Sequence, residues 1–422
     1  MIPLCFIICG FRIVNLGYLI SRRIYKKDRY ERRISSPVLK IAVAAVALGM
    51  VVMLIALSTG VGLQREIRRN IAAFSGHIQL TALQQGSNGT SQSVSLEQDF
   101  YPHFTAVPQV KHVQTFAQRA GILKTDHEFE GVVLKGLGAD YDLSGLSSFV
   151  KSGKMPRFGQ GEASDSLLIS QNTADALGLS CGERVKMYFI RDSGRPILRY
   201  FTIAGIFKSN IAEFDKNYAL GDLRAVQSIN RWDSTQVGGF ELILHDAKEL
   251  PSATEQVLSE TQWKFHVTNI ATEYGALLDW VAMFDVNIVV ILGIMILVCG
   301  VNMITVLLIL ILEKTSFIGM MKSLGADHRL LRQIFLWNAF YIILRGLFWG
   351  NLIGISLLLL QKYFGIVTLD SESYSIEVVP VYLNLGMILA LNLGTALLNM
   401  LMLLIPSHFI ARIRPAETAK YE

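Results

Sequence analysis

Long apolar segments separated by polar stretches dominate this chain. Residues 41–57 are uniformly apolar, and residues 288–312 are interrupted only by the polar side chains of Asn302 and Thr305. A helix needs about 20 apolar residues to cross the hydrocarbon core of a bilayer. Two further segments of this kind follow in the C-terminal part. The pattern therefore predicts four membrane-spanning helices, at residues 37–60, 284–312, 333–361 and 383–406.

The long stretch between the first two spans, residues 61–280, has a different pattern. Residues 199–207 alternate between polar and apolar positions, as a half-buried strand does. Residues 167–170 read as a strand leading into a helix at 171–177, and Gly178 is placed to end that helix. Further strands are expected at residues 76–80, 132–137 and 185–190. The fold class is thus an integral membrane α-helical protein with four transmembrane helices and a large α+β domain inserted between the first and second spans.

Charge predicts the orientation of the spans. Lys and Arg residues crowd the segment ahead of the first span, where only Asp28 and Glu31 oppose them. The loop between spans two and three, residues 313–332, is also basic, whereas the loop between spans three and four, residues 362–382, is acidic. Basic loops stay in the cytoplasm. Both termini, including the tail at residues 407–422, and the 313–332 loop are therefore expected in the cytoplasm, with the α+β domain on the far side.

The N-terminal residues, the net charge, and the cysteines and histidines limit the classes of function to consider. Residues 1–36 are expected to form a cytoplasmic or interfacial helix, because no small-residue cleavage site follows the apolar start; an artefact of start-site choice is the alternative. The net charge of +5 comes largely from the span flanks, so membrane lipids are expected partners and nucleic acid is not. Cys181 is the only cysteine outside apolar segments, which excludes a disulfide framework in the α+β domain. The histidines show no metal-ligand spacing, and we name no catalytic, cofactor-binding or metal residues.

The loop between spans two and three contains a short amphipathic segment at residues 313–326. Because a membrane span borders it on either side, a force applied to it must move the spans. At helical spacing one face collects apolar residues and leaves the lysines elsewhere; a helix lying on the bilayer surface is the alternative. The candidate coupling residues are Glu313, Lys314, Phe317, Ile318, Gly319, Met321, Lys322, Leu324, Gly325 and Ala326.

The third span contains two further candidate features. Gly346, Gly350 and Gly354 recur every fourth residue and would let another helix approach closely, although glycine is common in membrane helices. Arg345 lies well inside the span, where a charge is costly. It is expected to pair internally, with Asn351 or a backbone carbonyl, or to contact the headgroup of a substrate.

Several segments together resemble a known family. Residues 313–326 are similar to a coupling segment of the form E-K-x-x-x-I-G-x-x-K-x-L-G-A. Residues 58–71, with Gly62, Glu66 and Asn70, resemble a stalk that leaves the first span. Residues 201–218 resemble a block that ends in an acidic pair, here Glu213 and Asp215. Together with the C-terminal residues 413–422, these segments resemble permeases of the MacB/FtsX-like superfamily of ABC transporters, most closely the lipoprotein-releasing permeases.

That resemblance implies a function and a set of partners. Residues 313–326 would dock in a groove of a cytoplasmic ABC ATPase dimer, which would bind ATP and magnesium itself. This chain contains no G-x-x-x-x-G-K-[S/T] phosphate loop and is expected to bind no cofactor. The other implied partners are a second permease subunit, identical or paralogous, a lipoprotein cargo and a periplasmic carrier, at the inner membrane of a bacterium. The alternatives are MacB-like efflux of peptides or drugs and FtsX-like signalling to cell-wall hydrolases; an enzyme has least support.

Overall fold

The computed structural model describes residues 35–83, 92–156, 158–159, 163–190, 196–368 and 378–407. Its contacts divide the chain into two units. The helical unit comprises Met1–Leu63, Met283–Val367 and Pro380–Glu422, and the mixed unit comprises Gln64–Ala282 and Thr368–Val379. The expected N-terminal helix, the acidic residues of the 362–382 loop and the C-terminal tail lie almost wholly outside the described residues.

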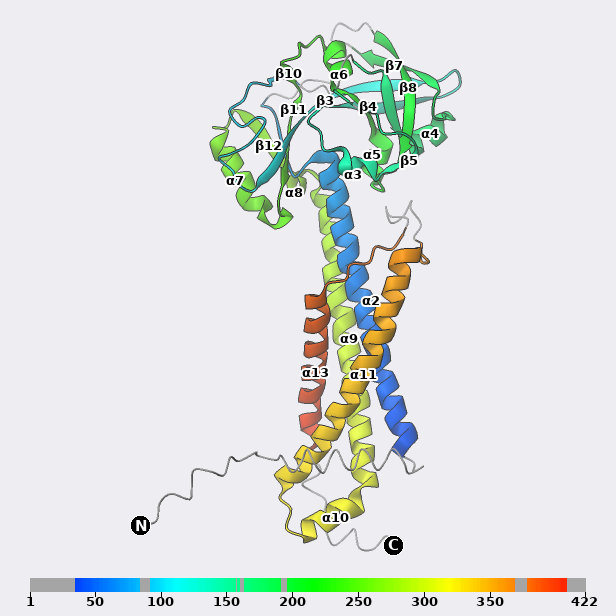
Figure 1. Cartoon of the computed structure of the whole chain (residues 1–422), viewed down its shortest axis with the longest axis vertical. Helices are drawn as coiled ribbons and strands as arrows, with labels where there is room; N and C mark the ends of the chain where they lie inside the picture. The colour runs from blue at the N-terminus through cyan, green and yellow to red at the C-terminus, as the bar shows by residue number, and fades with distance from the viewer. Residues whose placement is uncertain are drawn as a thin grey trace, which may run out of the picture. The chain divides into compact units, whose positions relative to one another are not determined.

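Four long helices and one short helix make up the described helical part, as Figure 1 illustrates. The long helices are α2 (Ser35–Ser75), α9 (Gly275–Glu313), α11 (His328–Phe364) and α13 (Leu385–Ser407), and the short one is α10 (Thr315–Ser323). By length and composition, each long helix could cross a membrane, which agrees with the expected number of four candidate spans among the described residues. Both α2 and α9 are longer than their apolar segments: α2 continues past residue 57, and α9 begins before residue 288. The residues in these extensions are compatible with a helix.

Apolar side chains from all four long helices meet in one buried cluster of the helical unit. Its members include Met50 and Leu54 of α2, Met303 and Leu307 of α9, Phe335 and Ile342 of α11, and Leu391 and Leu403 of α13.

A pair of amides links α11 to α13 inside this bundle. Asn351 donates to the side-chain oxygen of Asn392 at 2.6 Å, and Asn392 donates back at 3.0 Å. Each amide also donates to a carbonyl of its own helix, Leu347 or Ile388, at 2.7 Å. The two side chains therefore satisfy each other in a setting where no water would replace a lost partner.

We expect Asn351→Leu or Asn392→Leu to lower the free energy of unfolding by about 1 kcal/mol each. Each single change leaves the other amide without its partner, so the double variant should lose less than the sum of the two. The measurement is a double-mutant cycle from detergent-induced unfolding, with the exposed Asn302→Leu on α9 as control. Strictly additive losses would show that the two amides do not interact.

The mixed unit is built on a sheet of ten strands with the order β12-β1-β11-β3-β4-β9-β6-β8-β5, and β7 pairs with both β3 and β8. The pairs β4–β9 and β6–β8 are parallel, and the other pairs in this sheet are antiparallel. A separate two-stranded sheet joins β10 to β2. The strands are β1 (Ile78–Ala82), β2 (Val94–Ser95), β3 (Val110–Lys124), β4 (Phe129–Leu137), β5 (Val150–Gly153), β6 (Ser166–Ser170), β7 (Arg184–Ile190), β8 (Pro196–Phe207), β9 (Tyr218–Asp222), β10 (Gln236–Val237), β11 (Gly239–Leu244) and β12 (Phe265–Asn269).

Short helices cover parts of this sheet, with α7 beside β12 and α4 beside β8 (Figure 1). They are α3 (Leu143–Ser147), α4 (Gln171–Leu177), α5 (Ala212–Asn217), α6 (Leu223–Asn230), the 3-10 helix η1 (Ala247–Glu249), α7 (Leu250–Glu260) and α8 (Ile270–Glu273). The unit is α+β, as its sequence pattern predicts.

The strand-to-helix prediction at residues 167–177 is confirmed by β6 and α4. Ser170 caps the helix by accepting from Thr173 N at 3.0 Å. Gly178 ends it with a φ of +63°, a conformation that glycine adopts without strain. Glu213 and Asp215, the acidic pair of residues 201–218, lie in α5. Their position in the first turn suits the positive end of a helix dipole.

Candidate functional site

The segment between α9 and α11 folds as the separate helix α10, which begins after a break at Lys314. Ile318 N donates to Lys314 O at 2.9 Å in the first turn of α10. At the other end Gly325 has a φ of +87°, its N–H donates to Lys322 O, and Ala326 N–H donates to Met321 O. These two bonds form a Schellman motif, which satisfies carbonyls that a helix end would leave unpaired. Gly325 and Ala326 thus terminate the helix.

The side chains of α10 point in two directions. Ile318 is fully buried and belongs to the bundle cluster, and Met321 packs against the same cluster. Leu324 is 77% exposed, and Met320, which the spacing argument passed over, is 55% exposed. The expected apolar face is therefore divided between residues that anchor α10 to its own chain and residues that remain available. An anchored helix that presents exposed apolar residues can move the bundle when a partner moves it.

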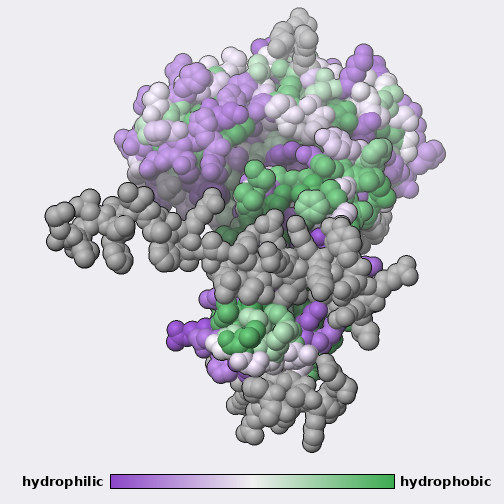
Figure 2. Space-filling model, turned by 60° about the horizontal axis from the view of Figure 1, so that its bottom comes forward, coloured by the Kyte–Doolittle hydropathy of each residue, from purple (hydrophilic) through white to green (hydrophobic). Residues whose placement is uncertain are grey.

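Charged groups border the exposed apolar residues of α10. Glu313 is exposed at the end of α9, and Lys314 and Lys322 are half-buried at the two ends of α10. Lys322 lies in the last turn, where a cation interacts favourably with the helix dipole. Figure 2 brings the end that carries α10 toward the viewer and shows hydrophobic surface flanked by hydrophilic surface there.

The three glycines of the third span all lie buried against α2. A Cβ atom built on Gly346 would lie 2.6 Å from Val46 Cβ, and one on Gly354 would lie 2.9 Å from Leu54 Cδ1. At Gly350 the added atom would lie 2.6 Å from Met50 Cβ and 2.8 Å from the backbone oxygen of Ala47. Real Cβ contacts are not this short, so the α2–α11 approach requires glycine at Gly346 and Gly350. At Gly354 the close atom is the end of a flexible side chain, which can shift at lower cost.

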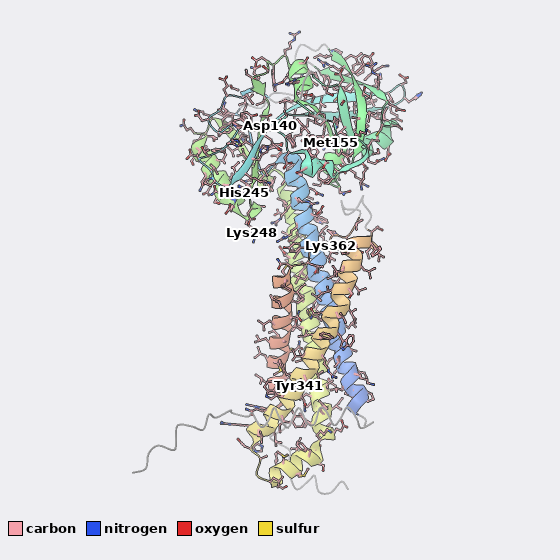
Figure 3. All side chains as sticks on the ribbon, viewed as in Figure 1. Asp140, Met155, His245, Lys248, Tyr341 and Lys362 are labelled. Carbon is pink, nitrogen blue, oxygen red and sulfur yellow. The ribbon has the colours of Figure 1, made fainter. Side chains whose placement is uncertain are left out.

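Arg345, the charged residue within the third span, has an exposed side chain on α11. Asn351, the internal partner considered for it, is paired with Asn392 instead. Tyr341, labelled in Figure 3, lies one turn before Arg345 on the same helix.

Gly62 and Glu66, two residues of the predicted stalk, differ in their contacts: Gly62 is packed against backbone, whereas Glu66 pairs with a neighbouring side chain. Gly62 faces the segment before α13, where an added Cβ would lie 2.5 Å from Pro380 O, and Tyr382 N donates to Ser58 O nearby. Glu66 forms an exposed pair with Arg69 at 2.6 Å, and such pairs contribute little stability.

Asn70 of the stalk and Asp215 of the acidic pair both form hydrogen bonds with Ser209. Asn70 donates to Ser209 O at 3.3 Å, and Asp215 accepts from Ser209 N at 2.8 Å and from Ser209 Oγ at 2.7 Å. Burial raises the pKa of Asp215, while hydrogen bonds from Ser209 and Asn210 oppose that shift. Asp215 therefore fixes the loop that receives the stalk helix and is not presented to solvent.

In the part of the chain that the structure describes, His, Cys, Asp and Glu side chains do not cluster as metal ligands would. No group of three His, Cys, Asp or Glu side chains there could hold a metal ion. Burial lowers the pKa of His77, whose Nδ1 accepts from Leu244 N at 3.3 Å. Cys181 and Cys299 are both free thiols.

Two family models together match most of the chain. The model described as the MacB-like periplasmic core domain matches residues 41–259, which is more than half of the chain. The model described as the FtsX-like permease C-terminal region matches residues 289–415. The first region contains β1 to β11 and ends before β12, and the second region contains α10.

Characterised relatives match almost from end to end. The lipoprotein-releasing system transmembrane protein LolE of Haemophilus influenzae is 21% identical over 96% of this chain and 99% of its own length. The transmembrane protein LolC of the same kind of system from Neisseria meningitidis serogroup B is 23% identical over 94% of this chain and 97% of its own. Among solved structures, the periplasmic region of MacB from Actinobacillus actinomycetemcomitans covers 49% of this chain and 95% of that chain, at 14% identity with a TM-score of 0.33.

Proposed function

The chain belongs to the membrane permeases that join a MacB-like periplasmic core domain to an FtsX-like C-terminal region, and from this premise we propose that it is a permease subunit of a lipoprotein-releasing ABC transporter. In this role it would use ATP hydrolysis by a separate subunit to extract lipoproteins from the inner membrane of a bacterium. The extracted lipoproteins would pass to a carrier for delivery to the outer membrane.

The observation that carries this proposal is the end-to-end match to relatives named for lipoprotein release. Two of them align over 94–96% of this chain. The match includes both the mixed unit and the long apolar helices.

The topology we propose places the mixed unit in the periplasm, inserted between α2 and α9. Four spans put both termini on one side, and the basic residues ahead of α2 favour the cytoplasm for that side. The loop that contains α10 would then also be cytoplasmic, within reach of a soluble ATPase.

We propose that α10 is the coupling helix and that Leu324 and Met320 fill a groove of the ATPase subunit. Exposed apolar residues bordered by polar ones are a feature of protein–protein interaction sites. Ile318 would transmit the movement, because it is fully buried in the bundle cluster to which α2, α9, α11 and α13 all contribute. Two permease subunits, identical or paralogous, would each engage one ATPase.

The cargo path we propose runs along α9. Val290, Ile294, Leu297 and Val301 lie at helical spacing on this helix, and each is at least half exposed within this chain. Such a stripe suits the acyl chains of a lipoprotein or a helix of the second permease subunit. The corresponding apolar stretch of α2 is more buried, since it packs against the glycines of α11.

Conditional depletion of this chain tests the proposed function. We expect lipoproteins to accumulate in the inner membrane before other defects appear, which is measured by separating the two membranes and quantifying acylated proteins in each. An unchanged distribution would contradict lipoprotein release. Hypersensitivity to a drug or peptide would then favour efflux, and failed cell separation would favour signalling to cell-wall hydrolases.

A further inference from the structure

A charged pair is completely buried in the middle of the mixed unit. Lys135 of β4 and Glu241 of β11 are 1% and 0% exposed, and Lys135 Nζ lies 2.7 Å from Glu241 Oε1. Tyr141 OH donates to Glu241 Oε2 at 2.8 Å, and Gln114 Nε2 donates to the same oxygen at 3.0 Å. Asp140, labelled in Figure 3, directly precedes Tyr141. Its side chain accepts a hydrogen bond from the backbone N–H of Thr115 in β3.

This pair is joined to the last turn of α2, residues 70–75, which we call the stalk end. Lys135 Nζ donates to the backbone oxygen of Phe74, and Tyr141 OH lies 3.1 Å from that oxygen. Gln79 Nε2 donates both to Ser75 O at 3.0 Å and to Glu241 Oε1 at 3.1 Å. The last carbonyls of a helix have no partner within it. Here two of them are capped by side chains that also contact Glu241.

Packing at the stalk end reinforces these bonds. The Phe74 ring stacks on Phe214 with centroids 4.2 Å apart, and Lys135 Nζ lies 5.1 Å from the Phe74 centroid. Gly76 follows with a φ of +66°, and a Cβ there would lie 2.8 Å from Glu241 Cβ. The chain therefore leaves the helix in direct contact with the buried pair.

Stability of the sheet alone does not explain why Lys135 and Glu241 are charged residues. An apolar pair of similar volume would commonly be as stable, since removing two charges from water is costly. Burial lowers the pKa of Lys135, and the nearby Glu241 opposes that shift. What an apolar pair could not supply is a cation at the negative end of the α2 dipole and a donor for the Phe74 carbonyl.

We propose that Lys135, held by Glu241 and Tyr141, is a positioning residue that locks the stalk end onto the sheet, so that the end of α2 and the sheet move as one body. This inference rests on the proposed function, in which movement of the spans is transmitted to the periplasmic domain. Without these contacts, the chain could bend at Ser75–Gly76 and the domain would not follow the spans. Lys135 acts through the backbone of α2 and does not touch cargo.

A spin-labelled protein that keeps Lys135 and Glu241 provides the first test. In the complex with its ATPase, spin labels are placed at Cys181 and at an Arg68→Cys site, both exposed, after the other cysteines are replaced. We expect one narrow distance distribution that is the same without nucleotide and after trapping with ATP and vanadate. A broad distribution, or one that shifts on trapping, would overturn the proposal. This readout needs no cargo, so it remains informative if lipoprotein release itself proves wrong.

A variant provides the second test. Lys135→Met combined with Glu241→Gln removes both charges while leaving Gln114 and Tyr141 an acceptor. We expect this protein to fold, to show a broadened label distance, and to release at least about fivefold less lipoprotein per ATP hydrolysed. Lys186→Met, which removes only the exposed pair with Asp126, is the matched control and should change neither readout. A folded double variant with an unchanged distance distribution and unchanged release per ATP would show that the pair is merely structural.

Discussion

Replacing Gly350 by leucine is expected to separate α2 from α11 and to destabilise the helical unit by about 3 kcal/mol, at the upper end of the usual cost of overpacking. The position has no room for even a methyl group, because the nearest atoms include the backbone oxygen of Ala47 as well as Met50 Cβ. A backbone atom cannot rotate away as a side chain can. The measurement is the free energy of detergent-induced unfolding of the purified chain.

Gly394 on α13 supplies the matched control. A Cβ built there would meet nothing within 4 Å, so Gly394→Leu should change the free energy of unfolding by less than about 0.5 kcal/mol. Similar losses for the two leucine variants would contradict the packing of α11 against α2. They would indicate a general effect of adding a large side chain to a membrane helix.

Replacing Leu324 by glutamate is expected to weaken binding of the ATPase subunit by about 2 kcal/mol, or about 30-fold in Kd. In the proposed complex the leucine enters an apolar groove, where an unpaired carboxylate would be buried at high cost. Because Leu324 is 77% exposed in this chain, the change should leave the unfolding free energy nearly unaltered. Binding is measured by titrating the purified permease in nanodiscs with the ATPase subunit.

Two further variants separate docking from folding. Leu324→Met keeps an apolar side chain of similar volume and should bind the ATPase normally. Ile318→Ala removes a side chain buried in the bundle cluster and should lower stability instead. If Leu324→Glu bound the ATPase as tightly as the unaltered chain, α10 would not dock through this face.

The spans could be predicted from sequence because their signal is long and redundant. A run such as residues 288–312 offers the same information at nearly every position, so a few polar residues do not hide it. The α4 boundaries were also accessible, since Ser170 and Gly178 are local signals for a helix start and end.

The strands were harder to predict wherever polar residues are buried. The longest strand, β3, was missed because Gln114 and Arg119 interrupt its apolar pattern, yet both are buried. Lys135 lies in a strand that was predicted, but nothing local distinguishes a buried lysine from an exposed one. Its partner Glu241 is 106 residues away in the chain, and only the β3–β4 and β3–β11 pairings bring the two together.

The division of α10 into buried and exposed residues likewise required the tertiary structure. Periodicity places Phe317, Ile318, Met321 and Leu324 on one side of a helix, but it cannot say which part of that side the chain covers itself. The cover comes from the bundle cluster, which includes residues as distant in sequence as Val46 and Leu403. A sequence pattern can find an amphipathic helix, whereas its free surface depends on its neighbours.

The most direct measurement of the central claim is lipoprotein release from a reconstituted membrane. The permease, its second subunit and the ATPase would be placed in liposomes with a triacylated lipoprotein and a soluble carrier outside. The account predicts that lipoprotein appears on the carrier only when ATP is hydrolysed, and that Leu324→Glu abolishes this transfer. ATP hydrolysis without any lipoprotein reaching the carrier, in a complex that is fully assembled, would contradict it.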